Sequence, residues 1–77
     1  MNEYITRNPE DLGKTVRERR GEMKLTQAEA AALCKVGVRF LSELENGKPT
    51  LHLGKVMLVL RAFGLILVLK RRGPSHE

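Results

Sequence analysis

The residues best suited to recognise a partner lie in and just after the segment VRFLSELENGK, residues 38–48. An arginine in the first turn of a short helix, as Arg39 would be, can donate two parallel hydrogen bonds to guanine O6 and N7. Val38 would offer a methyl surface to thymine, and Glu43 could accept from cytosine N4 or repel a wrong register. Taken alone, Arg39 is more simply a solvated helix residue, so its surroundings must decide its role.

The first two helices that would position these side chains have clear start signals. Asn8-Pro9-Glu10-Asp11 offers a capping residue, a proline suited to the first turn, and carboxylates that complement the helix dipole. Thr26 and Glu29 have the spacing of a capping box, which predicts a second helix over the alanine-rich stretch QAEAAALC. Small side chains in this stretch would let another helix approach closely.

The second half of the chain predicts two more helices and a strand. The third helix is expected from Val38 to about Glu45 and the fourth from about Leu53 to Phe63, with Asn46-Gly47 and Gly64 as their ends. The run LILVLKR that follows is apolar on both faces, as is typical of a covered strand. Another candidate strand is EYIT, residues 3–6. Because a lone strand leaves backbone groups unpaired, we expect an all-α domain of four helices plus a C-terminal β-strand that pairs across a homodimer.

Length and composition narrow the choice of partners. A chain of 77 residues forms one domain, near the size below which a staple such as a disulfide, a metal or a second subunit is needed. Cys34 is the only cysteine, which excludes a disulfide within the chain. With His52 and His76 it cannot form a closed zinc site without carboxylates, so oligomerisation is the favoured source of added stability. The 14 Lys and Arg against 9 Asp and Glu give a net charge of +5, which suits a polyanionic partner.

Catalysis and membrane insertion find little support in the sequence. No Ser-His-Asp or Cys-His set stands at a recognisable spacing and no glycine-rich phosphate loop is present, so we expect neither an enzyme nor a cofactor. The N-terminus lacks the basic and apolar regions of a signal peptide, and the apolar run at residues 65–69 is too short to span a bilayer. These features predict a cytoplasmic protein.

Two short helices joined by a tight turn and flanked by helices form the helix-turn-helix pattern. LTQAEAAALCKVGVRFLSELENGK, residues 25–48, resembles the Cro and phage-repressor helix-turn-helix (the XRE family) without a gap. The PEDLG start, the VGVRFLSELENGKPT centre and the GLILVLK tail are also similar to small HipB-like antitoxins, including the Y4mF type. The chain would then comprise an N-terminal extension (1–7), a lambda-repressor-like domain (8–64), a dimerisation strand (65–72) and a frayed tail (73–77).

The resemblance implies roles for individual residues. The residues facing base edges would be Val38, Arg39 and Glu43. Those contacting DNA phosphates would be Thr26, Gln27, Ser42, Asn46 and Lys48. A buried structural ion pair between the first and third helices would be formed by Arg20 and Glu45. The dimerisation strand would contribute Leu65, Ile66, Leu67, Val68 and Leu69.

The implied function is a repressor that binds a palindromic double-stranded operator as a homodimer. By the same resemblance, it would be the antitoxin of an operon that it represses, with a HipA-like kinase toxin as partner. Two alternatives remain: a free-standing phage or host repressor without a toxin, and a protein-interaction module whose basic face meets an acidic protein.

Three positions depart from the family pattern. Ala30 stands where a larger aliphatic residue is common. Lys35 stands where the turn usually has glycine, and the left-handed conformation required there costs a lysine free energy. Phe40 replaces a small polar residue, and we expect it to pack against the fourth helix or a partner.

Overall fold

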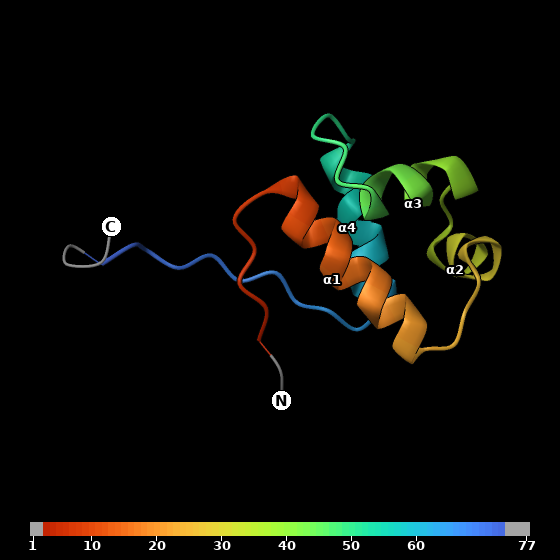
Figure 1. The fold of residues 1–77 in the computed structure, drawn as a ribbon, viewed down its shortest axis with the longest axis horizontal. Coiled ribbons are helices and arrows are strands. Elements are labelled where there is room, and N and C mark those ends of the chain that lie inside the picture. Colours follow the sequence, from red (N-terminus) through yellow and green to blue (C-terminus); the bar gives the residue numbers. More distant parts are fainter. Residues whose placement is uncertain (1–2, 74–77) are drawn as a thin grey trace.

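The computed structural model describes residues 3–73, in which the chain forms four α-helices (Figure 1). Their bounds are α1 (Pro9–Glu22), α2 (Gln27–Cys34), α3 (Val38–Glu45) and α4 (Leu53–Ala62). The predicted all-α architecture of four helices is confirmed. No helix in this part of the chain is long and apolar enough to cross a membrane. The frayed ends expected at residues 1–2 and 74–77 lie outside the described residues.

Three of the helices begin at side-chain caps. The Asn8 side chain accepts the backbone N–H of Asp11 at 2.7 Å, which starts α1 at the proline. At α2 the predicted capping box is complete, because Thr26 Oγ1 accepts the N–H of Glu29 at 3.1 Å and the Glu29 carboxylate accepts the N–H of Thr26 at 2.9 Å. His52 caps α4 through Nδ1, which accepts a backbone N–H at 3.2 Å. Local side-chain chemistry therefore sets where these helices start.

All four helices end in the same way, at a residue with positive φ. These residues are Lys24 (59°), Lys35 (60°), Gly47 (80°) and Gly64 (73°). After each of them the next N–H donates to a carbonyl five residues back, at 2.8–3.3 Å, and the pattern is that of a Schellman motif. Glycine adopts this conformation freely, whereas lysine does so at a cost. The left-handed turn expected at Lys35 is present.

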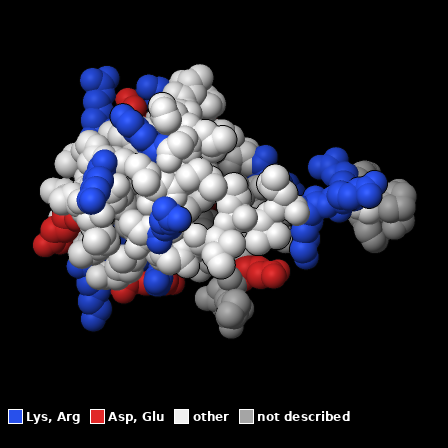
Figure 2. Space-filling model, turned by 180° about the vertical axis from the view of Figure 1, so that it is seen from behind, with Lys and Arg blue, Asp and Glu red and all other residues white. Residues whose placement is uncertain are grey.

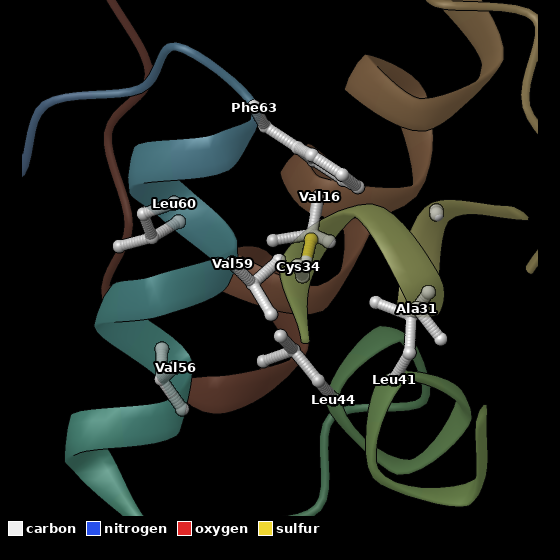
Figure 3. Close-up of a cluster of buried hydrophobic side chains, with 10 residues drawn as sticks. Val16, Ala31, Cys34, Leu41, Leu44, Val56, Val59, Leu60 and Phe63 are labelled. Atoms are coloured by element: carbon white, nitrogen blue, oxygen red, sulfur yellow. The ribbon is translucent and has the colours of Figure 1, made fainter. Parts of the chain in front are cut away.

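The core lies where α1, α2, α3 and α4 meet (Figure 3). Its buried side chains are Val16, Ala30, Ala31, Cys34, Leu41, Leu44, Val56, Val59, Leu60 and Phe63. The alanines of α2 leave room for the neighbouring helices to approach. Burial raises the pKa of the Cys34 thiol, which serves as a small core residue. Phe40 packs against this core. The Lys55 Nζ atom of α4 lies over the Phe40 ring, 5.9 Å from the ring centroid, in agreement with the expected packing of Phe40 against the fourth helix.

The C-terminal strand predicted at residues 65–72 is not formed in the single chain. Residues 65–73 run as an irregular extended segment away from the helices (Figure 1), and residues 3–6 do not pair with it. The physical reason is that a strand needs a partner edge for its backbone groups, and the rest of the described chain supplies none. Leu65 packs partly against the core, whereas Ile66 and Leu69 are 87% and 89% exposed. The apolar tail therefore remains uncovered.

The backbones of α1 and α3 approach each other closely at Gly13, on the buried side of α1. A Cβ atom at this position would collide with the Leu44 carbonyl oxygen and would lie 2.6 Å from the carbonyl oxygen of Glu45. The absence of a side chain therefore lets the C-terminal turn of α3 rest directly on α1. The sequence pattern alone did not single out this glycine.

We predict that Gly13→Ala destabilises the protein by about 1–3 kcal/mol or more, because the added methyl meets rigid backbone. Gly21→Ala is the matched control, since a Cβ at Gly21 of the same helix meets nothing within 4 Å. The control should be neutral or stabilising by up to about 1 kcal/mol, because alanine favours helix. Urea unfolding of both variants gives the comparison, and equal stabilities would contradict the close packing of α1 on α3.

Candidate nucleic-acid interface

The α3 helix has one face in the core and one in solvent. Leu41 and Leu44 are buried, with 0% and 2% exposure, and fix the rotation of the helix. The first turn of α3 has no side-chain cap, so its backbone N–H groups are open. Val38 is 47% exposed there and the Arg39 side chain is 91% exposed. The two foremost side chains of α3 are therefore free to contact a partner.

A cluster of charged side chains continues along the exposed face of α3. The Glu43 carboxylate lies 3.4 Å from Arg39 Nε, one helical turn earlier, and 3.4 Å from Lys48 Nζ, just beyond the helix. Ser42 and Asn46 lie beside this cluster, with the Asn46 amide 3.5 Å from the Ser42 hydroxyl. The structure thus brings together five residues that the sequence assigned to base or phosphate contacts.

The remaining two expected phosphate contacts lie at the start of α2 and already have partners within the protein. The Thr26 hydroxyl oxygen is used in the capping box. The Gln27 amide nitrogen donates to Glu45 at 3.0 Å, a contact that was not foreseen from the sequence. One amide hydrogen and the amide oxygen of Gln27 stay available, so its side chain is oriented by the protein and can still reach outward.

Behind this surface, Arg20 and Glu45 form an ion pair that joins α1 to α3. The guanidinium donates through Nε at 2.6 Å and through Nη2 at 3.0 Å to the two carboxylate oxygens of Glu45. Arg20 also donates through Nη1 to the carbonyl of Leu25 at 2.9 Å, in the connection between α1 and α2. With the contact from Gln27, one carboxylate ties three helices together, and its side chain is only 2% exposed.

The charge state of this pair follows from its contacts. Burial alone would raise the pKa of Glu45, but the hydrogen bonds from Arg20 and Gln27 outweigh it and hold the pKa of this carboxyl below its ordinary value. The hydrogen bond to Glu45 in turn raises the pKa of Arg20. Both partners are therefore charged at neutral pH.

A second arginine makes a long-range contact with the end of α4. Arg19 donates through Nε to the carbonyl of Phe63 at 2.8 Å, while its Nη1 lies 3.2 Å from Glu22. This links the last turn of α1 to the end of α4, where the apolar tail begins. The sequence offered no signal for it, because the two residues lie 44 positions apart.

The surface charges are unevenly spread. On the face drawn in Figure 2, Lys and Arg side chains project around the helical body and again from the extended C-terminal segment, and the area between them is mostly uncharged. A groove beside this segment is lined by residues of α4 and of the tail, among them Met57, Leu58, Ile66 and Leu67. Within residues 3–73 no group of His, Cys, Asp and Glu is placed to hold a metal ion. The arrangement provides cations, amides and a methyl surface for binding a polyanion.

Comparison with known proteins agrees with this geometry. A family model described as helix-turn-helix matches residues 16–66, which include α2, the turn and α3. A protein of Sinorhizobium fredii named as an uncharacterized HTH-type transcriptional regulator, y4mF, is 47% identical over 71 residues, which cover 92% of this chain and 93% of that protein. A solved structure titled MDT Protein has a TM-score of 0.79 at 20% identity, over 90% of this chain and 97% of that one, and shares the fold.

We predict that Arg20→Ala destabilises the fold by roughly 3–5 kcal/mol, because Glu45 would stay buried without its cation. Arg39→Ala is the control and should leave stability within about 0.5 kcal/mol, since its side chain is exposed.

The ion pair also makes stability depend on pH. The pKa of Glu45 is lower in the folded protein than in the unfolded chain, so its contribution to stability is fully present above the unfolded pKa. This contribution is lost as the pH falls through the folded pKa. Acid titration of unfolding should therefore show a smaller loss in Arg20→Ala than in wild type. An Arg20→Ala protein that melts like wild type but fails to bind DNA would instead make Arg20 a phosphate contact.

Proposed function

Since this chain belongs to the helix-turn-helix family, we propose that it is a sequence-specific DNA-binding repressor that reads duplex DNA with α3. The observation that carries the proposal is the first turn of α3, where Val38 and Arg39 stand in solvent on a helix whose opposite face is held in the core. The major groove accepts an α-helix, and an arginine in this place can bond bidentately to guanine. Val38 supplies an apolar surface for a thymine methyl group.

The residues around α3 would hold the DNA backbone. Lys48 and Asn46 follow α3, and Thr26 and Gln27 stand at the N-terminus of α2. The uncapped first turn of α3 adds open backbone N–H groups. Helix N-termini and amide side chains bind phosphate without reading sequence. Gln27 is held by Glu45, so its remaining polar atoms would meet a phosphate without first losing much side-chain freedom.

We propose that the protein acts as a homodimer joined through its apolar tail. Ile66 and Val68 are 87% and 66% exposed, and Ile66 lines a groove together with Met57 and Leu58 of α4. Pairing with the same segment of a second copy would satisfy the backbone edges and cover both faces of the tail. In Figure 1 the tail leaves the helical body on the side away from α2 and α3. A tail-mediated dimer would therefore leave both recognition helices free, about 34 Å apart on a palindrome.

The finer role that we propose is that of an antitoxin which represses its own operon and binds a kinase-like toxin. Its support is the similarity of the PEDLG start, the centre and the GLILVLK tail to HipB-like antitoxins. Co-expression with the neighbouring open reading frame tests it, because a kinase-like product should copurify and lose its toxicity. If no neighbouring product binds, the free-standing repressor is the correct interpretation.

For base reading, we predict that Arg39→Ala costs about 1–3 kcal/mol on the specific operator and relaxes preference at one base pair in each half-site. Gln27→Ala and Lys48→Ala are the comparison variants, and they should weaken binding almost equally on operator and random duplex. Titrations of a duplex selected from a random pool, at several salt concentrations, measure both effects.

Two results would oppose this assignment. Equal losses on operator and random DNA for Arg39→Ala would remove Arg39 as a base reader. A wild-type protein without salt-dependent binding to any duplex would instead favour a protein-interaction module.

For the dimer, we predict that removing residues 66–77 yields a monomer, or an aggregating species, with little operator affinity. Leu65 is retained because it packs on the core and its N–H closes the end of α4 at 2.8 Å. Ile66→Pro should act similarly if its N–H lies in the intersubunit ladder, since proline cannot donate. Leu33→Ser on α2, which also removes an exposed apolar side chain, should remain a dimer. Sedimentation at micromolar concentration is the measurement, and a shortened protein that stays dimeric would move the interface to α4.

A further inference from the structure

The carboxylate of Glu43 faces two cations of the proposed DNA-binding surface at the same time. Its Oε2 atom lies 3.4 Å from Arg39 Nε and 3.4 Å from Lys48 Nζ. The side chain of Glu43 is 28% exposed, compared with 91% for Arg39 and 44% for Lys48. The least exposed member of the cluster is therefore its single anion, and both cations contact the same carboxylate oxygen.

The backbone keeps this arrangement in place. Glu43 lies one helical turn after Arg39, the spacing at which side chains of a helix meet. At the other side the Schellman motif ends α3, and the N–H of Lys48 donates to the carbonyl of Glu43 at 3.0 Å. Gly47, with φ of +80°, makes the turn that returns Lys48 to this carbonyl. Both the main chain and the side chain of Glu43 thus contact Lys48.

The contact with Arg39 uses one edge of the guanidinium. Glu43 accepts from Nε, so the contact leaves the N–H groups of the two terminal nitrogens for another acceptor pair. These are the groups that a bidentate contact with guanine needs. A neutral guanine can therefore be bound while Arg39 stays on Glu43, whereas a negatively charged phosphate that approaches Arg39 or Lys48 is repelled by the carboxylate already in place.

From this geometry we infer that Glu43 is a specificity-determining residue that weakens binding to random DNA by holding Arg39 and Lys48, while orienting Arg39 for base reading. Binding to random duplex consists almost entirely of phosphate neutralisation by Lys and Arg, so a competing anion acts mainly on that mode. Such a repulsive element raises the ratio between correct and incorrect sites. The inference rests on the proposed function and assigns Glu43 a role different from accepting a hydrogen bond from cytosine.

The test is Glu43→Gln, which keeps the shape of the side chain and removes its charge. Binding to random duplex should become about 3- to 10-fold tighter, and its logarithmic salt slope should steepen by about 0.9 for each freed cation that gains a phosphate. Affinity for a duplex selected by the wild-type protein should change less than about threefold, because the stronger phosphate contact of Lys48 is offset by the loss of the carboxylate that orients Arg39 for base reading. The specificity ratio therefore falls.

Two further variants separate this effect from a change in net charge. Glu22→Gln alters the charge equally and breaks an ion pair with Arg19, but it does so on α1. It should leave the specificity ratio unchanged. In an Arg39→Ala, Lys48→Ala background, Glu43→Gln should no longer tighten random binding, since the two cations it would release are absent.

Each contrary outcome has a distinct meaning. Loss of operator affinity confined to one C·G pair, with no gain on random DNA, would make Glu43 a base reader and overturn the inference. The same gain from Glu22→Gln, or a persistent gain in the double-alanine background, would show a non-specific charge effect and also overturn it. If the wild-type protein binds no duplex, the proposed function itself fails, whereas unchanged random binding by Glu43→Gln beside a DNA-binding wild type removes the inference alone.

Discussion

The arrangement of the three N-terminal helices depends on one buried carboxylate. Glu45 sits at the C-terminal end of α3, yet its oxygens are held by Arg20 of α1 and by Gln27 at the start of α2. A buried charge is tolerated only when its hydrogen-bonding capacity is met, so each of these partners is constrained by the others. Because Glu45 shares a short helix with Arg39, fixing its position also fixes the direction in which the exposed first turn of α3 points.

Close packing also stabilises the contact between α1 and the C-terminal end of α3. Gly13 lets the backbone of α1 touch the end of α3, and Leu41 and Leu44 fill the core on the adjoining face. The polar network and the close backbone contact therefore act on the same turn of α3. A rigid rear surface of this kind is what a recognition element needs, since misplacement of contacting groups loses affinity and specificity.

Local signals in the sequence predicted the helices well, because capping depends on residues three positions apart. The Asn8 cap and the Thr26 and Glu29 box were readable in this way, whereas the left-handed turn at Lys35 was expected from the family resemblance. The C-terminal strand was wrongly predicted for the single chain, because a β-strand forms only when its backbone pairs with the edge of another strand. The pattern of one segment does not reveal whether such a partner is present. Contacts between distant positions also escaped prediction from spacing. Arg19 with the Phe63 carbonyl is one example, and Gln27 with Glu45 is another. The Arg20 and Glu45 pairing was suggested by family resemblance rather than by chemistry alone.

The left-handed lysines have a consequence for the local stability of α2. Lys24 and Lys35 stand shortly before and directly after this eight-residue helix, and each carries a conformational cost of roughly 1–2 kcal/mol that a glycine would largely avoid. A short helix with strained connections on both sides can release that strain by opening while the rest of the domain stays folded. The amides of α2 should then exchange with solvent through a smaller opening than those of α1. The Gln27 hydrogen bond to Glu45 and the burial of Ala30, Ala31 and Cys34 in the core oppose this opening, so the exchange rates of the α2 amides would report how firmly these contacts hold the helix.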